Sequence, residues 1–126
     1  MKPPGYSTVS PYLVTTNAQK VIDFLKEVFD AQELRRYDMP DGSIMHAEVR
    51  IDDTVIMIGD SGEEWPAIPS VLHVYVDDVD ASYQCALAAG ADSIQEPSHK
   101  GNDPDRRGGV KDPSGNSWYL ATPVEN

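Results

Sequence analysis

The most informative stretch of the chain is Ile44-Met45-His46-Ala47-Glu48-Val49-Arg50-Ile51, followed by Asp52-Asp53 and then Thr54-Val55-Ile56-Met57-Ile58. The first eight residues place Met45, Ala47, Val49 and Ile51 on one side, with His46, Glu48 and Arg50 on the other. This alternation with a period of two is typical of a half-buried strand. The two aspartates supply a turn, and the mostly apolar residues after them predict a second strand.

The residues upstream of this stretch predict a strand, a helix and another strand. Residues 12–15 have the β-branched character of a short strand, and Asn17 is suited to cap a helix. A helix ending near Asp30 is indicated by apolar residues on one face, namely Val21, Ile22, Leu25, Val28 and Phe29. Residues 33–37 form a modest strand before the Pro40-Asp41-Gly42 turn. The order is therefore β-α-β-β-β.

The same order returns after a linker at residues 61–69. Residues 71–76 predict a strand, and Asp77 or Asp78 caps a helix that Gly90 terminates. A weak strand opens at Ile94, residues 97–109 are expected to form a long loop, and residues 117–121 form the last strand. The repeat has a period of roughly 60 residues. We expect a single α+β domain over residues 1–126, with modules at about 9–60 and 70–122.

Composition limits the possible partners. The 126 residues include 21 acids and 10 bases, which gives a formal net charge of −11. Such a chain repels nucleic acid and anionic membrane surfaces. Apolar runs such as residues 55–58 are far shorter than the roughly 20 residues of a membrane span. No secretory signal is visible, and the single Cys85 excludes an internal disulfide or a cysteine-based zinc cluster, so we expect a cytoplasmic protein.

Several short motifs occur in a particular order along the chain. They are Ser10-Pro11-Tyr12-Leu13-Val14, Phe29-Asp30-Ala31, Pro40-Asp41-Gly42 with His46-Ala47-Glu48, Val76-Asp77-Asp78-Val79-Asp80, Ala89-Gly90-Ala91 and Asp112-Pro113-Ser114-Gly115-Asn116. Together they resemble the vicinal oxygen chelate superfamily of glyoxalases, bleomycin-resistance proteins and dioxygenases, and most closely its PhnB-like branch. The resemblance implies two βαβββ modules that form a curved, cup-like mixed sheet with the helices on its convex face.

The resemblance also implies where a metal would bind. In metal-dependent members each of four strands supplies one ligand, and the corresponding positions here are Ser10, Met57, Val71 and Tyr119. None of these is a histidine or a carboxylate, the usual ligands of an open divalent site. We therefore expect no metal and no cofactor. The alternative is a displaced metal site made of His46, Glu48 and His73.

Alternation along the strands predicts which side chains share the concave face. We expect a ligand pocket there, although the same residues could instead pack a closed or dimer-covered sheet. Trp65 in the linker is either a lid or a staple to the core, and Arg106 is either an anion clamp or a solvated charge. The candidate ligand-binding residues are Ser10, Tyr12, His46, Glu48, Met57, Trp65, Val71, His73, Tyr75, Arg106 and Tyr119.

Three functions remain open at this point. The first is a homodimeric protein that binds or sequesters a small hydrophobic or cationic compound without catalysis, as the bleomycin-resistance branch does. The second is a glyoxalase-type lyase or isomerase, or a dioxygenase, that uses the displaced metal site. The third is a structural or regulatory dimer with no ligand. The missing ligands and the negative charge favour the first.

Overall fold

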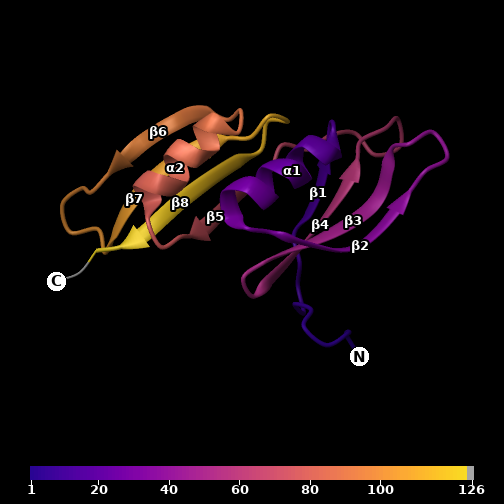
Figure 1. Cartoon of the computed structure of the whole chain (residues 1–126), viewed down its shortest axis with the longest axis horizontal. Helices are drawn as coiled ribbons and strands as arrows, with labels where there is room; N and C mark the ends of the chain where they lie inside the picture. The colour runs from indigo at the N-terminus through magenta and orange to yellow at the C-terminus, as the bar shows by residue number, and fades with distance from the viewer. Residues whose placement is uncertain (125–126) are drawn as a thin grey trace.

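The computed structural model describes residues 1–124 and contains two βαβββ modules (Figure 1). The first module consists of β1 (Tyr12–Thr15), α1 (Ala18–Phe29), β2 (Gln32–Asp38), β3 (Ile44–Ile51) and β4 (Thr54–Asp60). The second consists of β5 (Val71–Tyr75), α2 (Val79–Ala88), β6 (Asp92–Ser98), β7 (Asp105–Lys111) and β8 (Ser117–Pro123). The repeat expected from the sequence is thus present, with α+β architecture.

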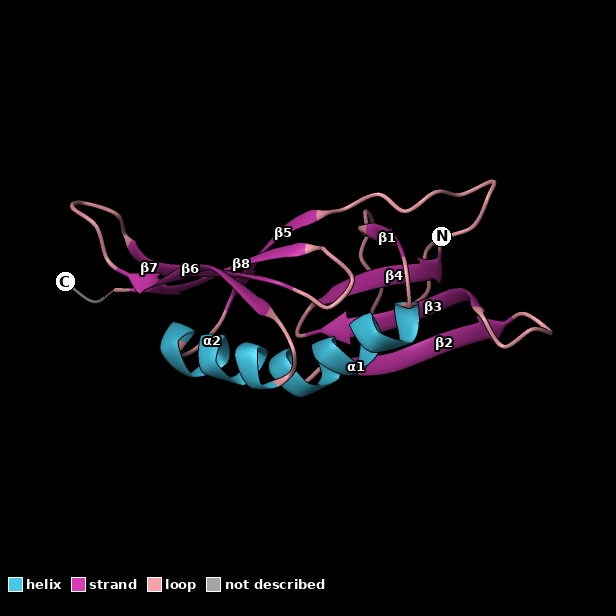
Figure 2. Ribbon diagram, turned by 90° about the horizontal axis from the view of Figure 1, so that it is seen from above, coloured by secondary structure: helices cyan, strands magenta, loops and turns pink. Residues whose placement is uncertain are grey.

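Each module forms its own four-stranded mixed sheet. The strand orders are β1-β4-β3-β2 and β5-β8-β7-β6, and the first strand of each module pairs in parallel with the last. The remaining pairs are antiparallel. Both helices lie on the same side of the two sheets, whereas the N-terminus lies on the other side (Figure 2). The sheet faces turned away from the helices are called the open faces below.

The helices begin and end where their capping residues predict. The Asn17 side chain accepts a hydrogen bond from the Lys20 amide, and Asp78 does the same for Ala81. Asp30 adopts a left-handed conformation that closes α1, and Gly90 has a φ of 101° just after α2. Glycine reaches this region without the strain of a Cβ atom, which explains its place after the helix.

The core lies between the helices and the inward faces of the sheets. Trp118 of β8 is fully buried, and its ring centroid is 5.5 Å from that of Phe29 at the end of α1. This contact joins the second sheet to the helix of the first module. Trp118 therefore faces the helices and belongs to the core. None of the helices in the described part of the chain is long and apolar enough to cross a bilayer.

The prediction of a long loop over residues 97–109 was wrong. Strand β6 extends to Ser98 and β7 begins at Asp105, so that only residues 99–104 connect them. The glycines of β7 misled the prediction, because glycine is uncommon inside strands. A Cβ atom at Gly109 would lie 3.0 Å from the Tyr119 ring, so glycine allows that ring to lie across the strand.

A buried carboxylate organises the turn between β7 and β8. Asp112 accepts hydrogen bonds from the amides of Ser114 and Asn116, from the Asn116 side chain and from the Trp118 indole, all within 3.0 Å. Asn116 in turn donates to Thr15 of β1 and accepts from the Ser70 amide just before β5. One turn therefore connects both modules through hydrogen bonds that are shielded from water.

Replacing Asp112 with asparagine should lower the free energy of unfolding by about 2–3 kcal/mol. The Asn116 side chain and the Trp118 indole now donate to the same carboxylate oxygen, and an asparagine would place an NH₂ group or a weaker, uncharged acceptor opposite these buried donors. Urea unfolding monitored by tryptophan fluorescence measures this loss. The matched control is Asp92→Asn at an exposed position, which should change stability by less than about 0.5 kcal/mol. Equal stability of the two variants would contradict the role assigned to Asp112.

Candidate functional site

The open face of the first module brings four of the predicted site residues into one row. Tyr12 of β1 pairs with Met57 of β4, and Met57 pairs with Glu48 of β3. His46 is two residues from Glu48 on the same strand and therefore points to the same face. Three adjacent strands thus present a phenol, a thioether, a carboxylate and an imidazole together.

Hydrogen bonds connect the polar members of this row. The Glu48 carboxylate lies 2.8 Å from His46 Nε2, and His46 Nδ1 lies 3.1 Å from the Tyr12 hydroxyl. The second oxygen of Glu48 accepts a hydrogen bond from the Tyr6 hydroxyl. We call this series Tyr12–His46–Glu48–Tyr6 the polar chain. It runs from the exposed phenol of Tyr12, through a Glu48 carboxylate that is only 4% exposed, to the phenol of Tyr6.

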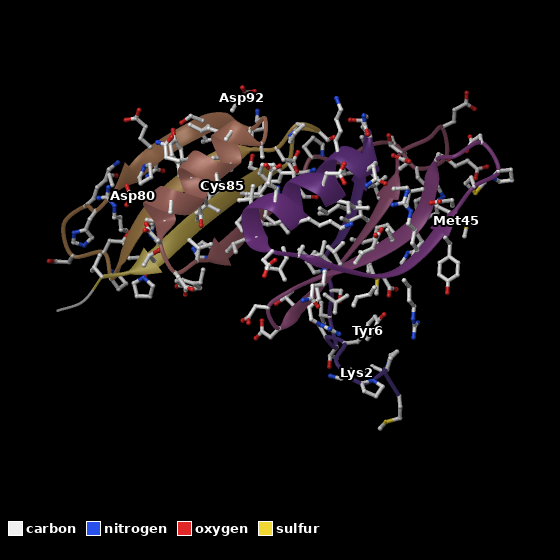
Figure 3. The ribbon with its side chains drawn as sticks, in the orientation of Figure 1. Lys2, Tyr6, Met45, Asp80, Cys85 and Asp92 are labelled. Carbon is white, nitrogen blue, oxygen red and sulfur yellow. The ribbon has the colours of Figure 1, made fainter. Side chains whose placement is uncertain are left out.

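Tyr6 was not among the site residues predicted from the sequence; it lies within residues 1–9, called the N-terminal arm below. The arm crosses the open face, where the Arg50 guanidinium donates to the Gly5 carbonyl and the Val55 amide donates to Ser7. The Arg35 guanidinium lies 5.1 Å from the centre of the Tyr6 ring. Figure 3 shows Tyr6 where the arm reaches the sheet. An aromatic residue within a polar arm was the only signal in the sequence.

The polar chain holds Glu48 in its charged form. Burial by itself would raise the pKa of Glu48, but the hydrogen bonds from Tyr6 and His46 outweigh burial and bring the pKa below its ordinary value. The same contact raises the pKa of Tyr6, because a phenolate beside Glu48 would be repelled. Burial raises the pKa of Tyr12. At neutral pH the Glu48 carboxylate is therefore charged and accepts from the neutral phenol of Tyr6 on one side and from His46 on the other, with the neutral phenol of Tyr12 beyond His46.

The open face of the second module carries another set of predicted residues. His73 and Tyr75 lie on β5 with their ring centroids 4.8 Å apart, and Tyr119 pairs with His73 across the sheet. Val71 begins the same strand and is 74% exposed. The Tyr75 hydroxyl donates to the buried Asp105 carboxylate at 3.1 Å. This hydrogen bond, together with the charge of Asp105, raises the pKa of Tyr75.

Arg106 does not lie on this face. It forms a two-pronged ion pair with Asp80 of α2, at 2.8 and 2.9 Å, and so lies on the helix side. Because residues alternate along β7, the neighbouring Arg107 is the one that reaches the open face, where it contacts His73, Asp103 and Asp105. The placement of Arg106 in the pocket is therefore corrected: its position in a strand, rather than a loop, fixes its direction.

Two other predicted residues lie apart from the polar chain. The Trp65 side chain is 70% exposed within the linker. The Ser10 hydroxyl, just before β1, is buried and has no hydrogen-bond partner in the described structure.

A groove runs between the two modules where β1 and β5 approach each other. It has a volume of about 570 Å³, and Tyr12, Val71 and His73 are among the residues that line it. The groove thus joins the edge of the first open face to the edge of the second. Leu13, Ile56 and Trp118 also line the groove and make its surface partly apolar.

The proposed alternative metal ligands are only partly brought together. His46 and Glu48 are hydrogen-bonded, whereas His73 lies in the other module and contacts Arg107. Among residues 1–124, no group of three or more histidine, cysteine, aspartate or glutamate side chains is arranged to hold a metal ion. The four positions implied by the family offer a hydroxyl, a thioether, an isopropyl group and a phenol, which do not fit a divalent metal.

Comparison with known proteins gives relatives of the same size. An uncharacterised protein of Mycobacterium bovis is 38% identical over 92% of this chain and 83% of its own length. The crystal structure of TioX from Micromonospora sp. ML1 is 27% identical, with a TM-score of 0.77 over 94% of this chain and 99% of that one. TnmS3, an antibiotic binding protein from Streptomyces sp. CB03234, is 22% identical with a TM-score of 0.69, over 94% of this chain and 100% of that one.

A protein-family model also matches the sequence of this chain. The model described as the Glyoxalase/Bleomycin resistance protein/Dioxygenase superfamily matches residues 7–120, which include both modules and the linker between them. The match agrees with the paired βαβββ topology and with the motifs that suggested the resemblance. The chain therefore belongs to the glyoxalase/bleomycin resistance protein/dioxygenase superfamily.

Proposed function

We propose that this protein binds a small aromatic or cationic compound, without a metal, in a pocket that a second copy of the chain completes. The observation that carries the proposal is the exposure of aromatic and apolar side chains on the open faces. Tyr12 is 47% exposed, Tyr75 is 64% exposed and Val71 is 74% exposed. Exposed apolar groups that cluster on one face favour association or ligand binding.

The charge of the molecule supports a cationic or neutral ligand over an anionic one. The net charge is −11, and the Glu48 carboxylate lies behind the exposed phenol of Tyr12. The basic group beside His73, Arg107, is already paired with Asp103 and Asp105. The antibiotic binding protein TnmS3 shares the fold and so provides a precedent for binding within this architecture. Fold alone does not transfer function, so the ligand class rests on the side chains.

A second copy is the occupant that we propose for the open faces. Symmetric dimers bury the same patch on both copies, and two copies supply two pairs of open faces. In such a dimer the open-face residues around Tyr12 and those around Tyr75 would line each pocket. Metal-dependent chemistry is not part of the proposal, because the donor groups at the family's ligand positions do not fit a divalent ion.

The first test measures the oligomeric state. Sedimentation equilibrium of the full chain should give twice the monomer mass of 13.8 kDa, and Val71→Asp should weaken the dimer at least about tenfold by placing a charge in the apolar contact. The control is Met39→Asp, the same kind of change at the exposed β2–β3 turn far from β5 (Figure 1). A monomeric wild type would contradict the pocket as proposed.

The second test measures binding directly. Isothermal titration of the dimer against a panel of cationic aromatic compounds should find members that bind at one site per chain. Val71→Asp should weaken this binding in parallel with dimerisation, because the pocket needs both copies. Absence of heat for the whole panel, with the protein shown to be dimeric, would contradict the proposed function.

The third test examines the charge of Glu48. Glu48→Gln should lower the free energy of unfolding by about 1–3 kcal/mol at pH 7, because Tyr6 and His46 lose a charged acceptor. The folded pKa of Glu48 lies below the unfolded value of 4.5, so its contribution is present above pH 4.5 and fades as pH falls through the folded pKa. Urea unfolding should show that the difference in unfolding free energy between the wild type and Glu48→Gln, here called the gap, becomes smaller below about pH 4.5. A gap that stays constant, or one equally large for exposed Glu64→Gln, would contradict this account.

A further inference from the structure

The directions of the hydrogen bonds on the open faces determine what the pocket can offer a ligand. A phenol has one hydrogen, and once that hydrogen is donated the oxygen can only accept. Tyr75 provides the simplest case. Its partner Asp105 is a buried carboxylate that also accepts from Arg107 at 3.0 Å, so it has no hydrogen to give. Tyr75 must therefore be the donor, and its free lone pairs face outward.

The direction of the hydrogen bond between Tyr12 and His46 follows from the buried carboxylate of Glu48. Glu48 is a carboxylate and can only accept, so the hydrogen of His46 is on Nε2. In a neutral imidazole the other nitrogen, Nδ1, then carries a bare lone pair. The Tyr12 hydroxyl is 3.1 Å from Nδ1 and must donate to it. Tyr6 contributes by donating to the other oxygen of Glu48, which fixes the carboxylate.

Both exposed phenols thus present acceptor lone pairs to the pocket. The strongest donor group in the neighbourhood, the Arg107 guanidinium, directs its hydrogens to Asp103, Asp105 and His73. His73 differs from the two phenols: because Arg107 donates to its Nε2, the hydrogen of a neutral His73 ring lies on Nδ1. The negative charge of Asp105 lies directly behind Tyr75, and that of Glu48 lies behind Tyr12 through His46, so both charges strengthen the phenol oxygens as acceptors.

We propose that the pocket selects compounds that bring N–H or O–H donors next to an aromatic surface, and that the Tyr12 and Tyr75 oxygens accept those hydrogens. Aromatic cations with amino or ring N–H groups fit this requirement, whereas aromatic cations of the same charge without such hydrogens do not. The inference rests on the proposed binding function and goes beyond it. It states that the ligand must donate hydrogen bonds, and it names the Tyr12 and Tyr75 oxygens as the acceptors.

Two probes separate hydrogen bonding from charge. Both 9-aminoacridine and 10-methylacridinium are flat tricyclic cations, but only the first carries N–H groups. Fluorescence titration of the dimeric wild type at pH 8.5 should show 9-aminoacridine binding about tenfold more tightly, the difference expected for one hydrogen bond to a polarised oxygen. In Tyr12→Phe this preference should fall to less than about twofold, because only 9-aminoacridine loses affinity.

The control is Tyr37→Phe, which removes the same hydroxyl from a ring 6.3 Å from His46 that is outside the polar chain. It should leave the preference unchanged. Thermal unfolding verifies that each variant is folded, and Tyr75→Phe repeats the test on the second module, so that misfolding of one variant does not remove the test. A reduced preference in Tyr75→Phe would equally support the proposal.

The outcomes separate the two proposals. Equal binding of the two probes by the wild type, or an unchanged preference in both Tyr12→Phe and Tyr75→Phe, would overturn the inference and leave the binding function standing. If the dimer binds neither probe, the proposed function itself is contradicted and the inference falls with it.

Discussion

The Asp112 carboxylate is the constraint on which the arrangement of the two modules depends. It is buried, and its four hydrogen bonds hold the β7–β8 turn in one geometry. That geometry directs Trp118 toward α1 and Asn116 toward β1 and the start of β5. A carboxylate without these donors would be costly to bury, so the turn, the indole and the module contact stabilise one another.

This connection explains why the open faces are available for function. The modules are joined through the β7–β8 turn and along the helix layer, with both helices on the same side of the sheets (Figure 2). Val71 and Tyr75 on β5 remain exposed, and the N-terminal arm covers part of β3 and β4. The fold therefore uses one face of each sheet for packing and leaves exposed aromatic and apolar side chains on the other.

Local patterns predicted most of the fold, because alternation and capping act over a few residues. Residues 44–51 form the strand that their alternation indicated, and that strand places His46 and Glu48 together. The failures have a different origin. Tyr6 contacts Glu48 across 42 positions, and no local pattern encodes that distance. Arg106 was misplaced because β7 was not recognised as a strand, and without a strand its alternation with Arg107 could not be read.

The polar chain also shows why residues of metal-binding type can have a different role here. A neutral imidazole has one hydrogen and one lone pair available. At His46 the hydrogen is committed to Glu48, as it would be in a metal site, but the lone pair accepts the Tyr12 hydrogen. An ion at Nδ1 would have to displace that phenol. The arrangement instead extends the influence of a buried charge through an imidazole to an exposed oxygen, and the proposed recognition of hydrogen-bond donors depends on that oxygen.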